Sequence, residues 1–119
     1  MMATIQNAKN IEQDVGIPWP TLRRIILNKV NNHLVKETDG ENTLLEIHLI
    51  GSRVTGTHRA NSDLDIAVIY AGDMREDDAF ATLSQEKLII NGVHLDFVPF
   101  SVKKRELANI IQPPSIQII

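Results

Sequence analysis

The sequence predicts an α+β fold in which helices pack on one face of a mixed β-sheet. Three observations support this prediction. Apolar residues follow a helical period over residues 21–36, and β-type runs fill residues 44–50 and 64–70. The stretch "EKLIINGVHLDFVPF" then places Asn91-Gly92 between two further β-type runs, and this dipeptide favours a two-residue hairpin turn.

The N-terminal third is predicted to be helical. The first 16 residues are polar with scattered apolar positions, so we expect a short helix or an irregular segment there. Pro20 suits the opening of a helix, which we expect to run from Thr21 to about Lys36. Its apolar positions recur every three or four residues and are Leu22, Ile25, Ile26, Val30 and Leu34.

The middle of the chain is predicted to alternate strands with short helices. Residues 44–50 are largely apolar and predict a well-covered strand. We expect a short helical turn from Ser52 to about Gly56, and a strand rich in β-branched side chains at residues 64–70. The charged stretch "AGDMREDD" is expected to lead into a further short helix.

The C-terminal third begins with the predicted hairpin. Lys87–Ile90 and Val93–Val98 should pair antiparallel across the Asn-Gly turn. Residues 102–111 are expected to form a second amphipathic helix, which the double proline at 113 and 114 ends.

Size and composition further limit the possible domain organisation, metal sites and location of the protein. The 119 residues are 43% hydrophobic, which predicts one globular domain over residues 1–119. The chain contains no cysteine, so disulfides and thiolate metal sites are excluded. The sequence has no apolar run of membrane-spanning length and its N-terminus lacks the layout of a signal peptide, so we expect a soluble, cytoplasmic protein.

The charge balance argues against broad nucleic-acid binding. A net charge of -3 does not supply the basic surface that phosphate-driven binding needs. Aromatic residues are only 4% of the chain, which disfavours a stacking platform for single strands. A mononucleotide remains compatible, because metal ions and a few backbone amides can meet its charge.

Three aspartates carry the chemistry that the sequence suggests. Asp63 and Asp65 are one residue apart at the start of a predicted strand, so they share one face of it. Asp96 lies in a later strand and joins them if the two strands are neighbours. Three such carboxylates repel one another unless cations lie between them. Hard oxygen ligands suit Mg²⁺, and two Mg²⁺ ions could clamp a phosphoryl or nucleotidyl displacement.

A second group of residues suggests an anion site. Gly51 directly follows a predicted strand, and a glycine there lets a phosphate approach the backbone closely. Ser52 offers its N–H and its hydroxyl. Arg53 is either a phosphate ligand, through a charge-assisted hydrogen bond, or a salt-bridge partner of the aspartates.

Each piece of this pattern has a simpler interpretation. Asp-x-Asp pairs usually lie solvated at strand ends, and Gly-Ser is common in loops; only the conjunction favours a functional site. His48 is expected to be a satisfied sheet histidine and His58 to contact solvent. His94 could flank the site, but an ordinary role on the strand is favoured.

The combined pattern resembles a known family. The stretch "IHLIGSRVTGTHRANSDLDIAVIY" is similar to the signature of the nucleotidyltransferase superfamily that includes DNA polymerase beta, and most closely to its minimal nucleotidyltransferase branch. The resemblance covers roughly residues 44–100 and implies a nucleotidyltransferase-like fold. The matching residues are Gly51, Ser52, Arg53, Gly56, Ser62, Asp63, Asp65 and Asp96.

The resemblance implies roles for these residues. Asp63 and Asp65 would bind two Mg²⁺ ions, and Asp96 would help one metal and activate the attacking hydroxyl. Gly51 and Ser52 would hold the triphosphate. The implied reaction transfers a nucleoside monophosphate from a nucleoside triphosphate, with ATP favoured, to a hydroxyl acceptor, and pyrophosphate leaves.

The resemblance also implies a partner. Minimal members often act beside a small helical protein, and several are antitoxins that adenylylate a helical toxin. The alternative is a non-catalytic module that keeps the fold and neutralises such a partner by contact; a weaker third option is a nucleotide or metal sensor. The apolar end "SIQII" fits either a partner contact or a frayed terminus.

Overall fold

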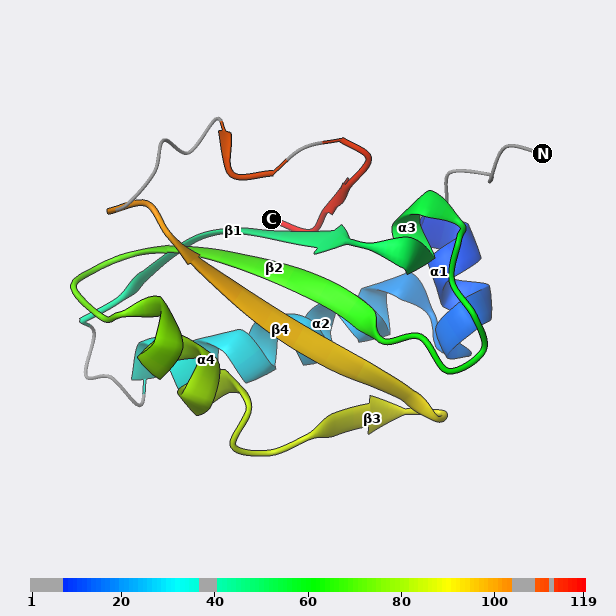
Figure 1. The fold of residues 1–119 in the computed structure, drawn as a ribbon. Helices are drawn as coiled ribbons and strands as arrows, with labels where there is room; N and C mark the ends of the chain where they lie inside the picture. The colour runs from blue at the N-terminus through cyan, green and yellow to red at the C-terminus, as the bar shows by residue number, and fades with distance from the viewer. Residues whose placement is uncertain (1–7, 37–40, 104–108, 112) are drawn as a thin grey trace.

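The computed structural model describes residues 8–36, 41–103, 109–111 and 113–119. Its sheet is five-stranded and mixed, with the order β3-β4-β2-β1-β5, and Figure 1 shows α2 and α4 below β1 and β2. This confirms the predicted α+β class. The elements are α1 Ala8–Val15, α2 Trp19–Val30, the π-helical η1 Asn31–Lys36, β1 Thr43–Ile50, α3 Ser52–Thr55, β2 Leu64–Ala71, α4 Glu76–Leu83, β3 Leu88–Ile90, β4 Val93–Ser101 and β5 Ile116–Gln117.

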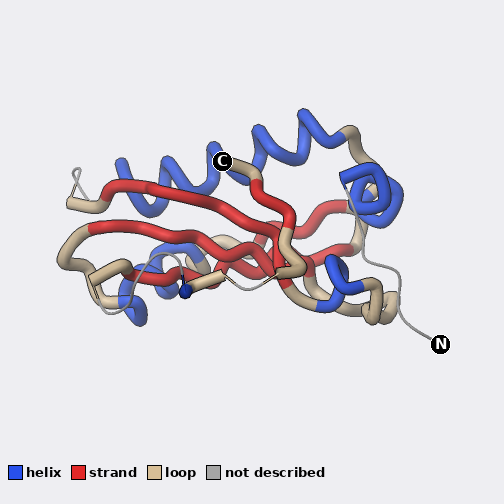
Figure 2. The backbone as a smooth tube through the Cα atoms, turned by 90° about the horizontal axis from the view of Figure 1, so that it is seen from above, coloured by secondary structure: helices blue, strands red, loops and turns tan. Residues whose placement is uncertain are grey.

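The long predicted helix is confirmed as two consecutive pieces. Helix α2 begins with Pro20 in its first turn and buries Leu22, Ile26 and Val30, which lie four residues apart on one face. The last six residues, η1, continue it with π-helical geometry and bury Leu34. Figure 2 shows this helical run alongside the strands. No helix within the described residues is long and apolar enough to cross a membrane.

Strand β2 is the centre of the sheet. It pairs antiparallel with β1 on one side and parallel with β4 on the other. The predicted hairpin is confirmed, since β3 pairs antiparallel with the first residues of β4. Its turn residues Asn91 and Gly92 both have positive φ, at 49° and 84°, as a type I′ turn requires. The parallel pairing of β2 and β4 brings two of the predicted site residues onto neighbouring strands.

The core lies between one face of the sheet and the helices. Alternate residues of β2 point into it, and α1, α2, α4 and β4 contribute to the same buried cluster. The opposite face of β2 carries the partly exposed Asp65 at the start of the strand, followed by the buried Ala67 and Ile69. The β2 residues in the core are Leu64, Ile66, Val68 and Tyr70.

The C-terminal end completes the sheet, so the expectation of a frayed terminus was wrong, while a partner contact through this end stays a prediction. Strand β5 pairs with β1, and Ile118 is buried in the core. The Ile118 N–H donates to the carbonyl of Ile47 at 2.7 Å, and Arg23 Nε donates to the carbonyl of Ile118 at 3.1 Å. Half of the helix predicted over residues 102–111, namely residues 104–108, lies outside the described residues, so this helix stays a prediction.

Candidate active site

Two of the three predicted carboxylates are brought together by strand register. Asp65 on β2 lies opposite Asp96 on β4, and both are partly exposed on the sheet face away from the core. Burial, followed by repulsion from Asp96 and Asp63, raises the pKa of Asp65 above its ordinary value of 3.8, and His94 partly offsets this. The three acids therefore act on one another, as the sequence predicts.

Asp63 is the most exposed of the three and has a partner of its own. Its Oδ2 lies 3.2 Å from Nδ1 of His94, which is two residues before Asp96 on β4 and shares its face. His94 therefore flanks the candidate site, which is the alternative that the sequence analysis named without favouring it, and a role for His94 there stays a prediction. The two-residue spacing from Asp96 was the signal that could have placed it in the site.

The carboxylate oxygens of the three aspartates are suitable ligands for a divalent cation, but they are not arranged in advance as a complete binding site. Carboxylate oxygens are hard ligands, and a cation among them would relieve the repulsion that raises the pKa of Asp65. Within the described residues, however, no three or more His, Asp or Glu side chains are arranged to hold a metal ion. Asp63 faces His94, so it would have to turn before joining the other two carboxylates.

Gly51 links the predicted phosphate site to the carboxylates. It follows β1 with φ of +83°, a conformation that side chains disfavour. A β-carbon at this position would overlap Oδ2 of Asp65 and lie 3.2 Å from its Cγ. The backbone at the end of β1 therefore packs directly against the carboxyl group at the start of β2, and glycine is required there for two reasons.

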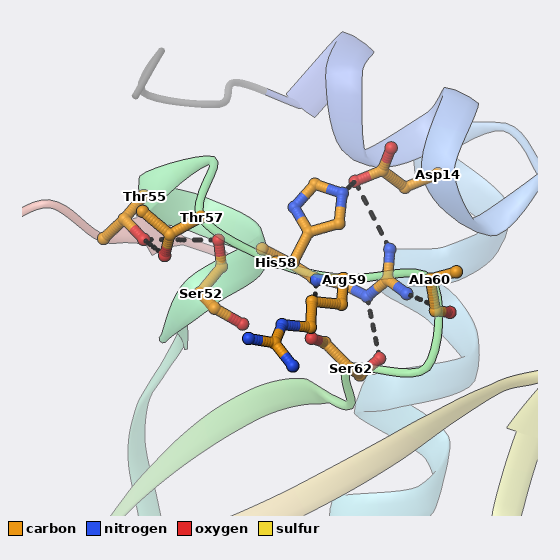
Figure 3. A network of polar contacts seen from close by, with 9 residues as sticks. Asp14, Ser52, Thr55, Thr57, His58, Arg59, Ala60 and Ser62 are labelled. Carbon is orange, nitrogen blue, oxygen red and sulfur yellow. Dashed lines mark hydrogen bonds and ion pairs between the residues drawn. The ribbon is translucent and has the colours of Figure 1, made fainter. Parts of the chain in front are cut away.

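Ser52 begins the short helix α3 beside this contact. Its carbonyl accepts hydrogen bonds from the Thr55 hydroxyl at 3.2 Å and from the Thr57 N–H at 3.0 Å. Its hydroxyl has no hydrogen-bond partner in the described part of the chain. Figure 3 shows this hydroxyl on the opposite side of the loop from Asp14. The hydroxyl therefore remains able to bind a ligand.

Arg53 is not directed at the carboxylate cluster. Its side chain is only 4% exposed; Nε donates to the carbonyl of Ser62 at 3.1 Å and Nη2 to the carbonyl of Ala60 at 3.4 Å. Nη1 forms an ion pair with Asp14 at 3.5 Å. These contacts favour the salt-bridge alternative, with Asp14 as the partner instead of the site aspartates. A phosphate-binding role for Arg53 stays a prediction.

Helix α1 holds the same loop through Asp14. Oδ2 of Asp14 lies 3.3 Å from Nε2 of His58, so His58 packs against α1 and the expectation of solvent around it was wrong. This contact could not be predicted from the sequence, because 44 residues separate the two side chains and no local pattern connects them. His48, by contrast, contacts Glu46 Oε1 at 2.7 Å and is the expected sheet histidine.

The end of the loop is closed by Ser62. Its hydroxyl accepts the Arg59 N–H at 2.8 Å, and its own N–H donates to the Arg59 carbonyl at 3.1 Å. Ser62 thereby fixes the turn that leads into Asp63 and β2. The same turn leaves the Arg59 side chain exposed.

One comparison with known proteins bears on this arrangement. The family model described as a nucleotidyltransferase domain matches residues 24–118. No curated protein and no solved structure matches the chain. The matched range contains every site residue that the sequence predicts, while α1 and Asp14 precede it.

Proposed function

Because the chain belongs to the nucleotidyltransferase domain family, whose chemistry is nucleotidyl transfer, we propose that it moves a nucleoside monophosphate from a nucleoside triphosphate to a hydroxyl acceptor. The observation that carries the proposal is the packing of Gly51 against Asp65, with Asp96 in register on the next strand. This places a backbone free of side chains beside a pair of carboxylates. ATP is the triphosphate to test first.

The proposed reaction is a displacement at phosphorus. The acceptor oxygen attacks the α-phosphorus, the bond from this phosphorus to the oxygen bridging to the β-phosphate breaks, and pyrophosphate leaves with the electron pair. Asp96 accepts the acceptor's proton. Asp96 is suited to this role because it lies on the β4 side of Asp65, away from Gly51.

The remaining roles follow from position. Gly51 and Ser52 bind the β- and γ-phosphates, since the one has no side chain of its own and the other has a hydroxyl with no partner among the described residues. Asp65 and Asp96, with Asp63 once it leaves His94, would hold two Mg²⁺ ions. When bound, such ions neutralise the carboxylates and polarise the phosphate oxygens.

The acceptor is proposed to approach from the β4 side. A cavity of about 190 Å³ between α4 and β4 has His94 and Asp96 in its lining, beside Phe80, Leu83 and Phe97. The acceptor hydroxyl belongs, in this proposal, to a small helical partner protein, as in antitoxin-type nucleotidyltransferases. The location of the pair is proposed to be cytoplasmic.

Mass spectrometry of the protein co-expressed with its genomic neighbour tests the proposal. With ATP and Mg²⁺, the partner should gain the mass of one or more nucleoside monophosphates, and Asp65→Asn should abolish the gain. Asp77→Asn, an exposed acid on α4, is the matched control and should leave the gain unchanged. Equal transfer by Asp65→Asn would refute the assignment. A tight complex without any mass change would favour the contact-only alternative.

A further inference from the structure

We propose that Arg59 makes the charged contact to the phosphates of the bound nucleotide, and that Arg53 presents it. The inference rests on the proposed function and deepens it, because it names the cation that accompanies Gly51 and Ser52. The sequence pattern pointed to Arg53, and Arg59 was given no role.

The donors of Arg53 are committed to the loop. Its guanidinium contacts the carbonyls of Ala60 and Ser62 and the carboxylate of Asp14, and the side chain is almost fully buried. Withdrawing the buried guanidinium toward a phosphate would break this ion pair and both hydrogen bonds, which is costly for a buried charge. Arg53 is therefore a positioning residue.

Arg59 has the opposite character. Its backbone is fixed on both sides by Ser62, while its side chain is exposed. Its guanidinium makes no hydrogen bond or ion pair with any residue that the structure describes. In Figure 3 the Arg59 side chain extends toward the Ser52 hydroxyl, on the side of the loop away from Asp14. A fixed backbone with an unpaired guanidinium is suited to a ligand.

The electrostatics of the site call for a cation at this position. A triphosphate must approach three carboxylates, and the loop between Gly51 and Asp63 contains Arg53, His58 and Arg59 as its basic residues. The first two face Asp14. The planar fork of Arg59 can bind two phosphate oxygens at once, which a lysine cannot do.

Isothermal titration with ATP and with AMP, both in Mg²⁺, tests the inference. Arg59→Ala should weaken ATP binding about tenfold and leave AMP binding nearly unchanged, since a charge-assisted bond to the outer phosphates is lost. Arg59→Lys should recover part of the loss. Arg75→Ala removes an exposed arginine on the α4 side and is the matched control, with no effect on either ligand.

The outcomes separate the two proposals. If the wild-type protein binds ATP no better than AMP, both the inference and the proposed triphosphate site fail. If it binds ATP and Arg59→Ala binds it equally well, the inference alone is overturned. An equal loss for ATP and AMP also overturns it. The melting temperature of ligand-free Arg59→Ala should match the wild type, because the exposed side chain makes no hydrogen bond or ion pair with the described residues.

Discussion

Two charged regions lie next to each other at the start of β2 and differ in the sign of the interaction between their charges. On one side, Asp14, Arg53 and His58 tie α1 to the loop. On the other side, Asp63, Asp65 and Asp96 gather on the outer sheet face. Both regions consist of aspartates with basic residues close by. They differ in whether neighbouring charges attract or repel.

The first region, which we call the loop anchor, places opposite charges together out of water. Arg53 has one ion pair and two carbonyl acceptors, so most of what its burial costs is recovered. Both carbonyls belong to residues just before Asp63. The anchor therefore fixes the backbone that delivers the first carboxylate to the site.

The second region, the acidic face, places like charges together. Neighbouring carboxylates raise the pKa of Asp65, so the ionised form carries a cost in the folded protein. Within the described part of the chain, Asp63 is the one of the three that forms an ion pair, and its partner is His94. The contrast indicates that the anchor stabilises the fold near the site, whereas the acidic face carries an electrostatic cost, as the proposed metal-binding role would require.

The largest expected effect follows from breaking the anchor. Arg53→Ala should lower the free energy of unfolding by about 3 kcal/mol, because it strands Asp14 and two loop carbonyls. Urea denaturation measures this. The control is Arg75→Ala, which breaks a surface pair with Asp77 and should cost less than about 0.5 kcal/mol. Equal losses in the two variants would mean that the anchor adds no stability.

The two regions also differ in how far the sequence predicted them. Strand alternation placed Asp63 and Asp65, and the Asn-Gly turn made Asp96 a strand residue. Local rules therefore predicted the acidic face and most of the sheet. The structure shows β4 beside β2 and parallel to it. The sequence analysis could only assume that these strands are neighbours, because pairing between distant strands leaves no local pattern.

The anchor was missed for the same reason. The contact of Asp14 with Arg53 joins α1 to a loop 39 residues later, and both side chains look ordinary in sequence. The family motif also favoured another direction for this side chain, because Arg53 directly follows Gly51-Ser52 and was therefore considered as a phosphate ligand. Only the observed burial of Arg53 shows that its donors face the loop.

A smaller effect, of opposite sign, is expected on the acidic face. Asp65→Asn should raise the free energy of unfolding at neutral pH, by less than about 1 kcal/mol, since water screens the partly exposed carboxylates. The folded pKa of Asp65 lies above its ordinary 3.8, so the wild-type cost is fully present above the raised pKa and fades as pH falls toward 3.8.

Urea denaturation from pH 7 to pH 4 measures this difference. The advantage of Asp65→Asn over the wild type should be largest at pH 7 and shrink as the pH falls. Comparing the two proteins at each pH cancels the titration of the other acids. A variant less stable than the wild type at pH 7 would show that Asp65 is held by favourable contacts and would remove the contrast with the anchor.

A small change in stability is expected at His94, which forms an ion pair with Asp63 on the acidic face. His94→Ala removes a half-exposed contact with Asp63 and should cost less than about 1 kcal/mol. It should also free Asp63 to join Asp65 and Asp96, so the Mg²⁺ concentration that half-saturates thermal stabilisation should fall several-fold. Lys103→Ala, which breaks an exposed pair with Asp73, is the control and should leave that concentration unchanged. If His94→Ala also leaves this Mg²⁺ concentration unchanged, His94 does not hold Asp63 away from Asp65 and Asp96. The affinity of the acidic face for a cation then does not depend on that contact.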